Sequence, residues 1–215
     1  MKEITPSAIQ TFFNFVGPWF YSFFFQAVGY RASLKYFLRR HHPRLNLVEG
    51  MKILDAGIGT GFMTINLLLE APTPLRITGL DFSEGMVSAL RKRLSIMGLE
   101  DRVALHMADM RRMPFPDEMF DLVVTSAAIE YLPRVEEGFA EFARVLRPGG
   151  KILAITTRDS FMGRFIGATW KNTVFTPEHI HRCMTDVGLH HIERLYFPAW
   201  FAHVNWWGVA FLGEK

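Results

Sequence analysis

Residues Met51–Phe62 read MKILDAGIGTGF, and this stretch decides the fold that we expect for the whole chain. Met51–Ala56 predicts a short buried strand, glycines follow at positions 57, 59 and 61, and the apolar run Phe62–Leu69 predicts a helix. Glycine permits a positive φ and close approach to a ligand, and the free N–H groups at a helix start favour an anion. The stretch therefore predicts a ligand-binding cradle.

The glycine spacing argues against a dinucleotide. A dinucleotide-binding loop needs Gly-x-Gly-x-x-Gly, and Phe62 stands where the third glycine would allow a pyrophosphate to approach. Asp55 at the strand end indicates a ligand that carries positive as well as negative charge. S-adenosylmethionine has both, whereas a tight turn without a ligand is the structural alternative.

Four more strands are expected after the cradle. Arg76–Asp81 ends in an acid 20 residues beyond Gly61, which is the spacing at which a carboxylate reaches ribose hydroxyls. Asp81 is therefore the first candidate for the ribose. The other expected strands are Val103–Asp109, Phe120–Ser126 and Leu146–Ile155.

Five motifs in this order resemble the class I S-adenosylmethionine-dependent methyltransferases. The motifs are LDAGIGTG at 54–61, GLDFS at 79–83, AD at 108–109, FDLVV at 120–124 and LRPGG at 146–150. The pattern is most similar to the subgroup of ubiquinone/menaquinone-type and phospholipid methyltransferases. The resemblance implies an α/β fold: a Rossmann-like seven-stranded sheet with helices on both faces and a reversed last strand.

The resemblance also implies how the cofactor is held. Phe82 and the start of the following helix, which Ser83 caps, border the adenosine, and Asp109 accepts a hydrogen bond from the adenine amino group. The candidate cofactor-binding residues are Asp55, Gly57, Gly59, Thr60, Gly61, Asp81, Phe82, Met86, Ala108, Asp109, Met110 and Ser126.

Composition fits one compact domain with an apolar partner. The chain has 215 residues, which suffice for one well-buried core. Its aromatic content of 14% indicates contact with something apolar, and its net charge of +3 is too small to argue for nucleic acid. The single Cys183 excludes an internal disulfide and indicates a reducing interior, so we expect the cytoplasm.

The N-terminal segment is uncharged and aromatic from Ile4 to Tyr30. Gly17-Pro18 and several polar residues interrupt it, which argues against a signal peptide and against a transmembrane helix. We expect a helical lid over residues 1–45, preceding a methyltransferase domain over 46–215. Trp19, Tyr21 and Tyr30 are the candidate substrate-binding residues. Packing in the core or in a dimer is the alternative to substrate contact.

Five cations follow the aromatic segment, with no acid before Glu49. They are Arg31, Lys35, Arg39, Arg40 and Arg44. Cations beside aromatic residues are typical of a segment that lies on an anionic membrane surface, although a charge run is usually a solvated helix face. Residues 12–44 therefore predict peripheral membrane contact.

Glu130 and Tyr131 are the candidate catalytic residues. They occupy the place where members of the resembled family face the transferred methyl group and often carry Glu-His. Without that His no ready general base is present, so Tyr131 either orients the substrate or packs. Val135–Val145 predicts an amphipathic core helix.

The last third of the chain predicts a substrate loop and a hairpin. Asp159–Thr173 is polar and contains glycine, which is typical of a loop. Thr176 with Pro177 predicts a helix start, and Leu189–Leu212 predicts the final hairpin. The histidines lack a metal-ligand spacing, so no metal is expected.

These patterns predict a methyltransferase that uses S-adenosylmethionine and a small hydrophobic acceptor. A phospholipid amine head group and a quinone-like or isoprenoid carbon both fit, and the chain is expected to be a monomer or homodimer. A non-catalytic S-adenosylmethionine-binding or assembly protein and a nicotinamide oxidoreductase are the alternatives.

Overall fold

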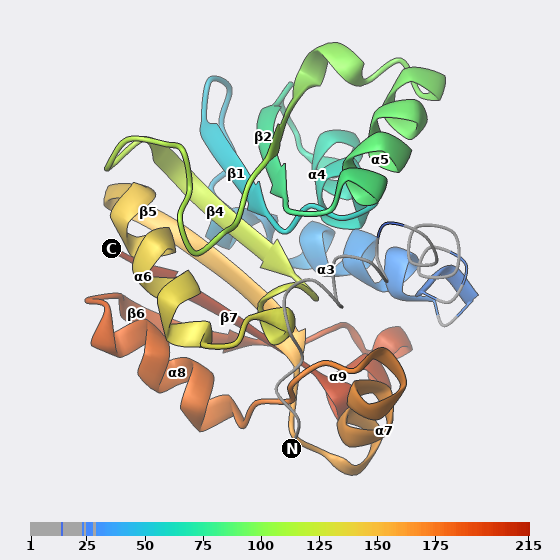
Figure 1. Ribbon diagram of the computed structural model, residues 1–215, viewed down its shortest axis with the longest axis vertical. Coiled ribbons are helices and arrows are strands. Elements are labelled where there is room, and N and C mark those ends of the chain that lie inside the picture. The colour runs from blue at the N-terminus through green and yellow to red at the C-terminus, as the bar shows by residue number, and fades with distance from the viewer. Residues whose placement is uncertain (1–13, 15–22, 24, 28) are drawn as a thin grey trace.

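A central sheet of seven strands organises the computed structural model, which describes residues 14, 23, 25–27 and 29–215 (Figure 1). The strands are β1 (Lys52–Ala56), β2 (Arg76–Asp81), β3 (Val103–Met107), β4 (Phe120–Ser126), β5 (Leu146–Thr157), β6 (His190–Leu195) and β7 (Gly208–Glu214). Their order in the sheet is β3-β2-β1-β4-β5-β7-β6, and β7 runs antiparallel to both neighbours. The expected strands, the final hairpin and the reversed last strand are confirmed.

Helices cover both faces of this sheet. They are α3 (Tyr30–Leu45), α4 (Phe62–Glu70), α5 (Glu84–Ile96), α6 (Val135–Val145), α7 (Phe161–Trp170), α8 (Pro177–Asp186) and α9 (Val204–Trp207), with the 3-10 turns η1 (Glu100–Arg102), η2 (Ile129–Tyr131) and η3 (Ala199–Phe201). Ser83 and Thr176 accept hydrogen bonds from Met86 N and His179 N, so both expected N-caps are confirmed.

Alternate side chains of each central strand pack into two separate hydrophobic cores. Ile53 of β1 joins the core under α3, α4 and α5, whereas its neighbour Leu54 joins the core under α6 and α8. Leu153 and Ile152 of β5 divide in the same way. Because both faces are covered, the parallel strands read as continuous apolar runs, which is why they could be located from the sequence.

Helix α3 belongs to the first of these cores. Leu34, Phe37 and Leu38 are almost completely buried and pack in the cluster that includes α4. Residues 30–45 therefore stabilise the sheet as well as approaching the site. The rest of the expected lid over 1–45 lies largely outside the described residues and stays a prediction.

Most of the cations on α3 have acidic partners. Lys35 and Arg39 both pair with Glu70 of α4, and Arg44 pairs with Glu193 of β6. Partly neutralised cations contribute less to attraction by an anionic surface, so the basic run is a weaker membrane signal than its sequence suggests. No helix in the described part of the chain is long and apolar enough to cross a bilayer.

Part of the expected loop at 159–173 is a helix, so that prediction was wrong. Helix α7 begins after Ser160, whose hydroxyl accepts a hydrogen bond from Gly163 N. A Cβ at Gly163 would lie 1.9 Å from Arg158 O, and one at Gly167 would lie 2.9 Å from the Val174 side chain. The two glycines serve close packing of the helix, which the sequence alone does not distinguish from loop flexibility.

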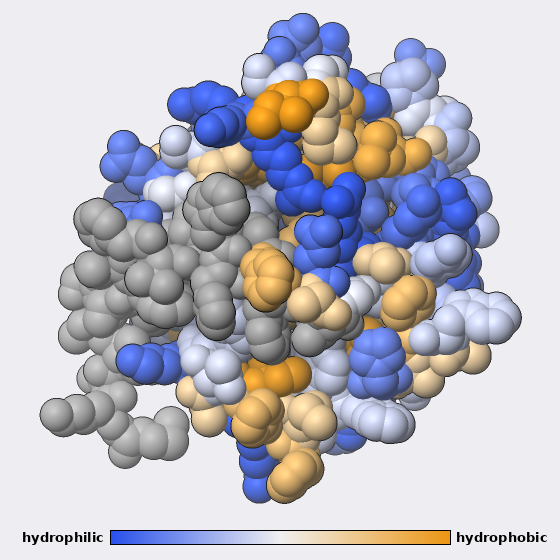
Figure 2. Space-filling view, turned by 90° about the vertical axis from the view of Figure 1, so that its right-hand side faces the viewer, coloured by the Kyte–Doolittle hydropathy of each residue, from blue (hydrophilic) through white to orange (hydrophobic). Residues whose placement is uncertain are grey.

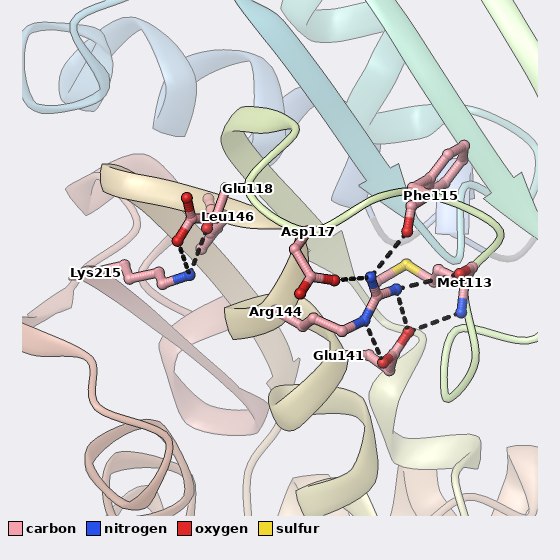
Figure 3. A network of polar contacts seen from close by, with 8 residues as sticks. All are labelled: Met113, Phe115, Asp117, Glu118, Glu141, Arg144, Leu146 and Lys215. Atoms are coloured by element: carbon pink, nitrogen blue, oxygen red, sulfur yellow. Dashed lines mark hydrogen bonds and ion pairs between the residues drawn. The ribbon is translucent and has the colours of Figure 1, made fainter.

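Arg144 ties the segment between β3 and β4 to α6 (Figure 3). Its guanidinium donates to Glu141, to Asp117 and to the carbonyl oxygens of Phe115 and Met113 at 2.7, 2.7, 2.8 and 3.2 Å. Glu141 in turn accepts a hydrogen bond from Met113 N at 2.8 Å. Charge-assisted bonds of this kind are stronger than neutral ones, so this network fixes the loop that leads to the site.

We expect Arg144→Met to lower the free energy of unfolding by about 2–3 kcal/mol, because Glu141, Asp117 and two carbonyl groups lose the charged donor that they share. Arg147→Met is the matched control, since Arg147 is more exposed and, among the described residues, forms an ion pair with Asp121 alone. Arg147→Met should lower the free energy of unfolding by less than about 1 kcal/mol. Urea unfolding measures both values, and equal losses would contradict the role assigned to the network.

Candidate functional site

The loop between β1 and α4 needs glycine at its ends for steric reasons. A Cβ at Gly57 would lie 2.3 Å from Ala128 Cβ, and one at Gly61 would lie 2.4 Å from the Leu90 side chain. Gly57, Gly59 and Gly61 all have positive φ. The sequence thus folds into a turn that other side chains could not adopt, and its backbone is left open toward the ligand side.

Asp81 is held at the end of β2 by the loop it faces. Its Oδ2 accepts a hydrogen bond from Gly59 N and its Oδ1 one from Ser83 N, both at 2.9 Å. Burial raises the pKa of Asp81 to about 6, although hydrogen bonds from Ser83 and Gly59 oppose that shift. The carboxylate is therefore fixed in orientation and retains lone pairs for a ligand hydroxyl.

Asp55 is a second buried acid, at the end of β1. Thr64 of α4 donates its hydroxyl to Asp55 Oδ2 at 2.6 Å. Burial raises the pKa of Asp55 to about 7, with a smaller contribution from the charge of Asp81. A buried acid with one hydroxyl donor is stabilised by a cationic ligand. Sequence reasoning missed Thr64, whose signal was a polar residue within the apolar run 62–69.

Two cavities meet at this loop. The first has an empty volume of about 410 Å³ and the second one of about 300 Å³, and both volumes include space open to solvent. The first is lined by Gly57, Gly59, Asp81, Phe82, Met86, Met110, Ala127, Ala128 and Tyr131. The second is lined by Tyr30, Asp55, Gly57, Ile58, Gly59, Thr60, Phe62, Met63 and Ser126.

The chemistry of these walls fits S-adenosylmethionine. In the first cavity Asp81 suits ribose hydroxyls, and Phe82 and Met110 suit a flat base. In the second, Asp55 suits a cation, and the buried Thr60 Oγ1 has no hydrogen-bond partner among the described residues. A buried hydroxyl of this kind favours a polar ligand group beside it.

Tyr30 closes the second cavity from α3. Its hydroxyl and that of Ser126, at the end of β4, are 2.7 Å apart. Burial raises the pKa of Tyr30, so the phenol stays neutral and acts as a hydrogen-bond partner rather than a base. Its ring lies 5.5 Å from that of Trp207. The other substrate candidates, Trp19 and Tyr21, lie outside the described residues.

The two catalytic candidates differ in position. Tyr131 lines the first cavity, and burial raises the pKa of its hydroxyl. Glu130 lines neither cavity: its carboxylate accepts hydrogen bonds from the hydroxyls of Thr156 and Thr157 at 3.0 and 2.9 Å. Burial raises the pKa of Glu130 as well. This geometry favours a positioning role for Glu130, while the catalytic roles stay predictions.

Of the cofactor candidates Ala108, Asp109 and Met110, which follow β3, only Met110 lines a cavity. Asp109 instead binds Arg111, with Oδ2 2.6 Å from Arg111 Nη2, and neither Asp109 nor Ala108 lines the two cavities. Burial alone would raise the pKa of Asp109, but the hydrogen bonds and charge of Arg111 hold it below its usual value. Their contact with the cofactor stays a prediction.

Two features of the structure had no place in the expected site. Ala127 lines the first cavity at a φ of 53°, a strained conformation for alanine that no sequence signal indicates.

Away from the cavities, possible metal-ligand atoms of Glu136, His179 and Cys183 lie within 4.8 Å of one another. The His-Cys spacing of four on α8 could have indicated this group. The expected absence of a metal stays a prediction.

Residues 53–150 match the family model described as a methyltransferase domain. The ubiquinone/menaquinone biosynthesis C-methyltransferase of Geobacter sulfurreducens is 34% identical over 107 residues, which are 50% of this chain and 42% of that protein. The phosphatidylethanolamine N-methyltransferase of Cereibacter sphaeroides is 37% identical over 117 residues, which are 54% of this chain and 55% of that protein. The chain thus spans about half the length of the curated relatives it matches.

Solved structures support the same fold. Haemonchus contortus phospholethanolamine N-methyltransferase 2 superposes with a TM-score of 0.75 at 16% identity, covering 98% of this chain and 61% of that one. Geranyl diphosphate C-methyltransferase from Streptomyces coelicolor gives 0.67 at 18% identity, covering 86% and 76%. At these identities the likeness concerns the fold alone.

We expect Gly59→Val to reduce affinity for S-adenosylhomocysteine by at least about 100-fold, because the side chain would enter the space where the two cavities meet. The change should leave the protein folded, since Gly57 O, at 4.0 Å, is the only atom of the described residues that lies near a Cβ there. Gly149→Val carries the same positive-φ strain away from both cavities and is the control. Calorimetry measures the affinities. Normal binding by Gly59→Val would place the ligand elsewhere.

Cofactor affinity should rise with pH between about 5 and 7, by up to about tenfold per unit, and then level off. With the pKa of Asp55 near 7, this acid is largely protonated below that pH, and a sulfonium ligand binds better to the ionised form. Asp55→Asn should flatten the profile. Asp109→Asn should keep its slope, because the lowered pKa of Asp109 leaves it ionised throughout. Titration calorimetry across this range would show a flat wild-type profile if the assignment were wrong.

Proposed function

This chain belongs to the class I S-adenosylmethionine-dependent methyltransferases, and we propose that it transfers the methyl group to a small hydrophobic or lipid-like acceptor. The family and S-adenosylmethionine as its cofactor, expected from the sequence, are confirmed by the methyltransferase-domain match and the curated relatives, and the expected fold is confirmed by the solved structures. The identity of the acceptor is the part of the function that we propose. We take it to be either a phospholipid amine head group or a quinone-like or isoprenoid carbon.

The observation that carries the proposal is the meeting of the two cavities at Gly57 and Gly59, with a buried acid on the wall of each. A ligand with a nucleoside at one end and a charged amino acid at the other would span both. Its reacting centre would then lie near the glycine loop. Tyr30 and Ser126 close the second cavity, which puts polar hydroxyls within reach of an acceptor.

The residues of the site position groups rather than exchange protons. The sulfonium of S-adenosylmethionine supplies an already activated methyl group, so holding the acceptor in line can provide most of the acceleration. Asp81 would hold the ribose, and Asp55 with Thr60 would hold the charged end. The neutral phenols of Tyr30 and Tyr131 would orient the acceptor by hydrogen bonds.

The aromatic surroundings of Tyr30 support an apolar acceptor. Its ring packs against Phe25 and Trp207 at centroid distances of 5.3 and 5.5 Å. These rings exclude water and would contact an acyl, isoprenoid or quinone group. Two relatives are named for a phospholipid amine and a quinone acceptor, and the proposal extends that range to this chain. A cytoplasmic enzyme, as monomer or homodimer, with a lid over 1–45, is part of the same proposal.

A non-catalytic S-adenosylmethionine-binding protein is the second candidate. One observation favours it: among the described residues that line the two cavities there is no histidine or lysine. A general base is needed only if the acceptor arrives protonated or is a weak acid. Turnover therefore discriminates the two functions, whereas cofactor binding does not.

We expect transfer of labelled methyl from S-adenosylmethionine into either phosphatidylethanolamine or a demethylated quinone in detergent micelles, identified by mass spectrometry of the product. Tyr30→Phe should lower kcat by about 5- to 30-fold and affinity for S-adenosylhomocysteine by a smaller factor, because it removes one hydrogen bond from the wall that the cofactor and the acceptor would share. Tyr36→Phe, at an exposed position of the same helix, is the control. Cofactor binding without transfer to any lipid extract would favour the binding protein.

A further inference from the structure

Large apolar side chains stand exposed on three neighbouring segments near the C-terminal end of the chain. We call them the aromatic surface: Phe161, Met162 and Phe165 of α7, Trp200 of η3 and Trp206 of α9. Phe161 is 90% exposed, Trp200 81%, Phe165 67% and Trp206 64%. Figure 2 looks onto the side of the molecule that carries α7 and α9 and shows hydrophobic side chains gathered in its lower part. Such clustering marks an interaction site, whereas single exposed residues do not.

Polar bonds join two of these segments, and ring contacts link the third to α3. Ser160, the N-cap of α7, donates its hydroxyl to Trp206 O at 2.5 Å, and Arg158 donates to Asn205 O at 3.2 Å. Phe201, which follows Trp200, packs its ring 5.6 Å from that of Tyr36 on α3. The exposed residues therefore sit on supports fixed to the body of the protein, as a rigid surface for docking requires.

The aromatic surface adjoins the acceptor end of the site. Trp206 is followed by the buried Trp207, whose ring lies 5.5 Å from that of Tyr30. Helix α7 ends at Trp170, whose ring lies 5.6 Å from that of Phe25 beside Tyr30. The side chains that face outward and those that approach the acceptor thus belong to the same short elements.

The charges of these segments suit an anionic partner. Between Arg158 and Thr173 there are three cations, at 158, 164 and 171, and one acid, Asp159. Asp159 is bound to Arg164, with Nε–Oδ1 2.5 Å apart. From Leu195 to Gly213 there is no Lys, Arg, Asp or Glu. These segments therefore combine exposed apolar side chains with more cations than acids.

This pattern favours a lipid surface over a second copy of the chain. A two-fold dimer through this face would set the cations of one copy against those of the other, with Asp159 already paired. A membrane instead accepts Trp and Phe at the level of its head groups and attracts cations when it is anionic.

We propose that the aromatic surface docks the enzyme on an anionic phospholipid bilayer and so brings the acceptor end of the site to the membrane. The inference rests on the proposed function, since a lipid-like acceptor is drawn from such a bilayer. It places the membrane contact on α7, η3 and α9 rather than on the cations of α3, of which Lys35, Arg39 and Arg44 are paired with acids.

Sedimentation with vesicles of phosphatidylcholine, with and without phosphatidylglycerol, tests the docking. Wild type should bind both and bind the anionic vesicles more tightly. Phe161→Ser with Phe165→Ser should weaken binding at least about tenfold, because two apolar rings no longer enter the lipid. Ile96→Ser, which removes a 78% exposed side chain on α5, is the matched control and should bind as wild type.

Two further variants separate the competing surfaces. Lys171→Gln should weaken the preference for phosphatidylglycerol, because Lys171 is an exposed cation, whereas Arg164 is already partnered by Asp159 and is left in place. Lys35→Gln with Arg39→Gln should keep the preference, because Glu70 already partners those two cations. If instead the α3 variant lost the preference and the other variant kept it, the membrane contact would lie on α3 and the proposal would be wrong. Wild-type binding by the double phenylalanine variant, or a dimer in gel filtration that this variant dissociates, would also overturn it.

Methyl transfer in detergent micelles distinguishes this inference from the proposed function. If wild type transfers methyl groups in micelles but does not sediment with vesicles, the docking is wrong and the proposed function stands. If it sediments through the aromatic surface but methylates no lipid, the docking stands and the proposed acceptor is wrong. Affinity for S-adenosylhomocysteine should be unchanged in every surface variant, which confirms that each is folded.

Discussion

The hydrogen bonds that join the glycine loop to the end of β2 are the constraint on which the site depends. Gly57 N and Ile58 N both donate to Leu80 O, at 2.8 and 2.9 Å, and Gly59 N donates to Asp81. These bonds fix the loop, the direction of α4 and the orientation of the acid at once. A glycine at 57 is required because the loop then passes against Ala128 without room for a Cβ. The cradle is therefore set by packing as much as by conformational freedom.

The same arrangement buries the carboxyl groups of Asp55 and Asp81. Their burial lowers the free energy of unfolding at neutral pH. Folded-state pKa values of about 7 for Asp55 and about 6 for Asp81 lie above the usual value near 4. Between those values the folded form binds more protons than the unfolded chain, so each acid destabilises the fold as pH rises. A cationic ligand bound beside Asp55 would offset part of that loss. Local instability of this kind is typical of a binding site rather than of a core.

The sequence predicted those elements whose position depends on residues close by in the chain. Strands buried on both faces, the caps at Ser83 and Thr176, and the cradle could all be located because each depends on neighbouring residues. Helix α7 could not, since Gly163 and Gly167 are explained only by Arg158 and Val174, which pack against them. The role of α3 depended likewise on partners distant in sequence. Its cations looked free because Glu70 and Glu193 are far along the chain.

The cofactor end and the acceptor end of the site come from different parts of the chain. Residues 53–150, which match the methyltransferase model, supply the glycine loop, Asp55 and Asp81. Tyr30 and Trp207, which the proposed function places at the acceptor end, and the whole aromatic surface fall outside that stretch. The relatives align with about half of this chain, and their names give different acceptors. Acceptor choice in this chain should therefore depend on α3, α7 and α9, where substitutions can change the acceptor while cofactor affinity is preserved.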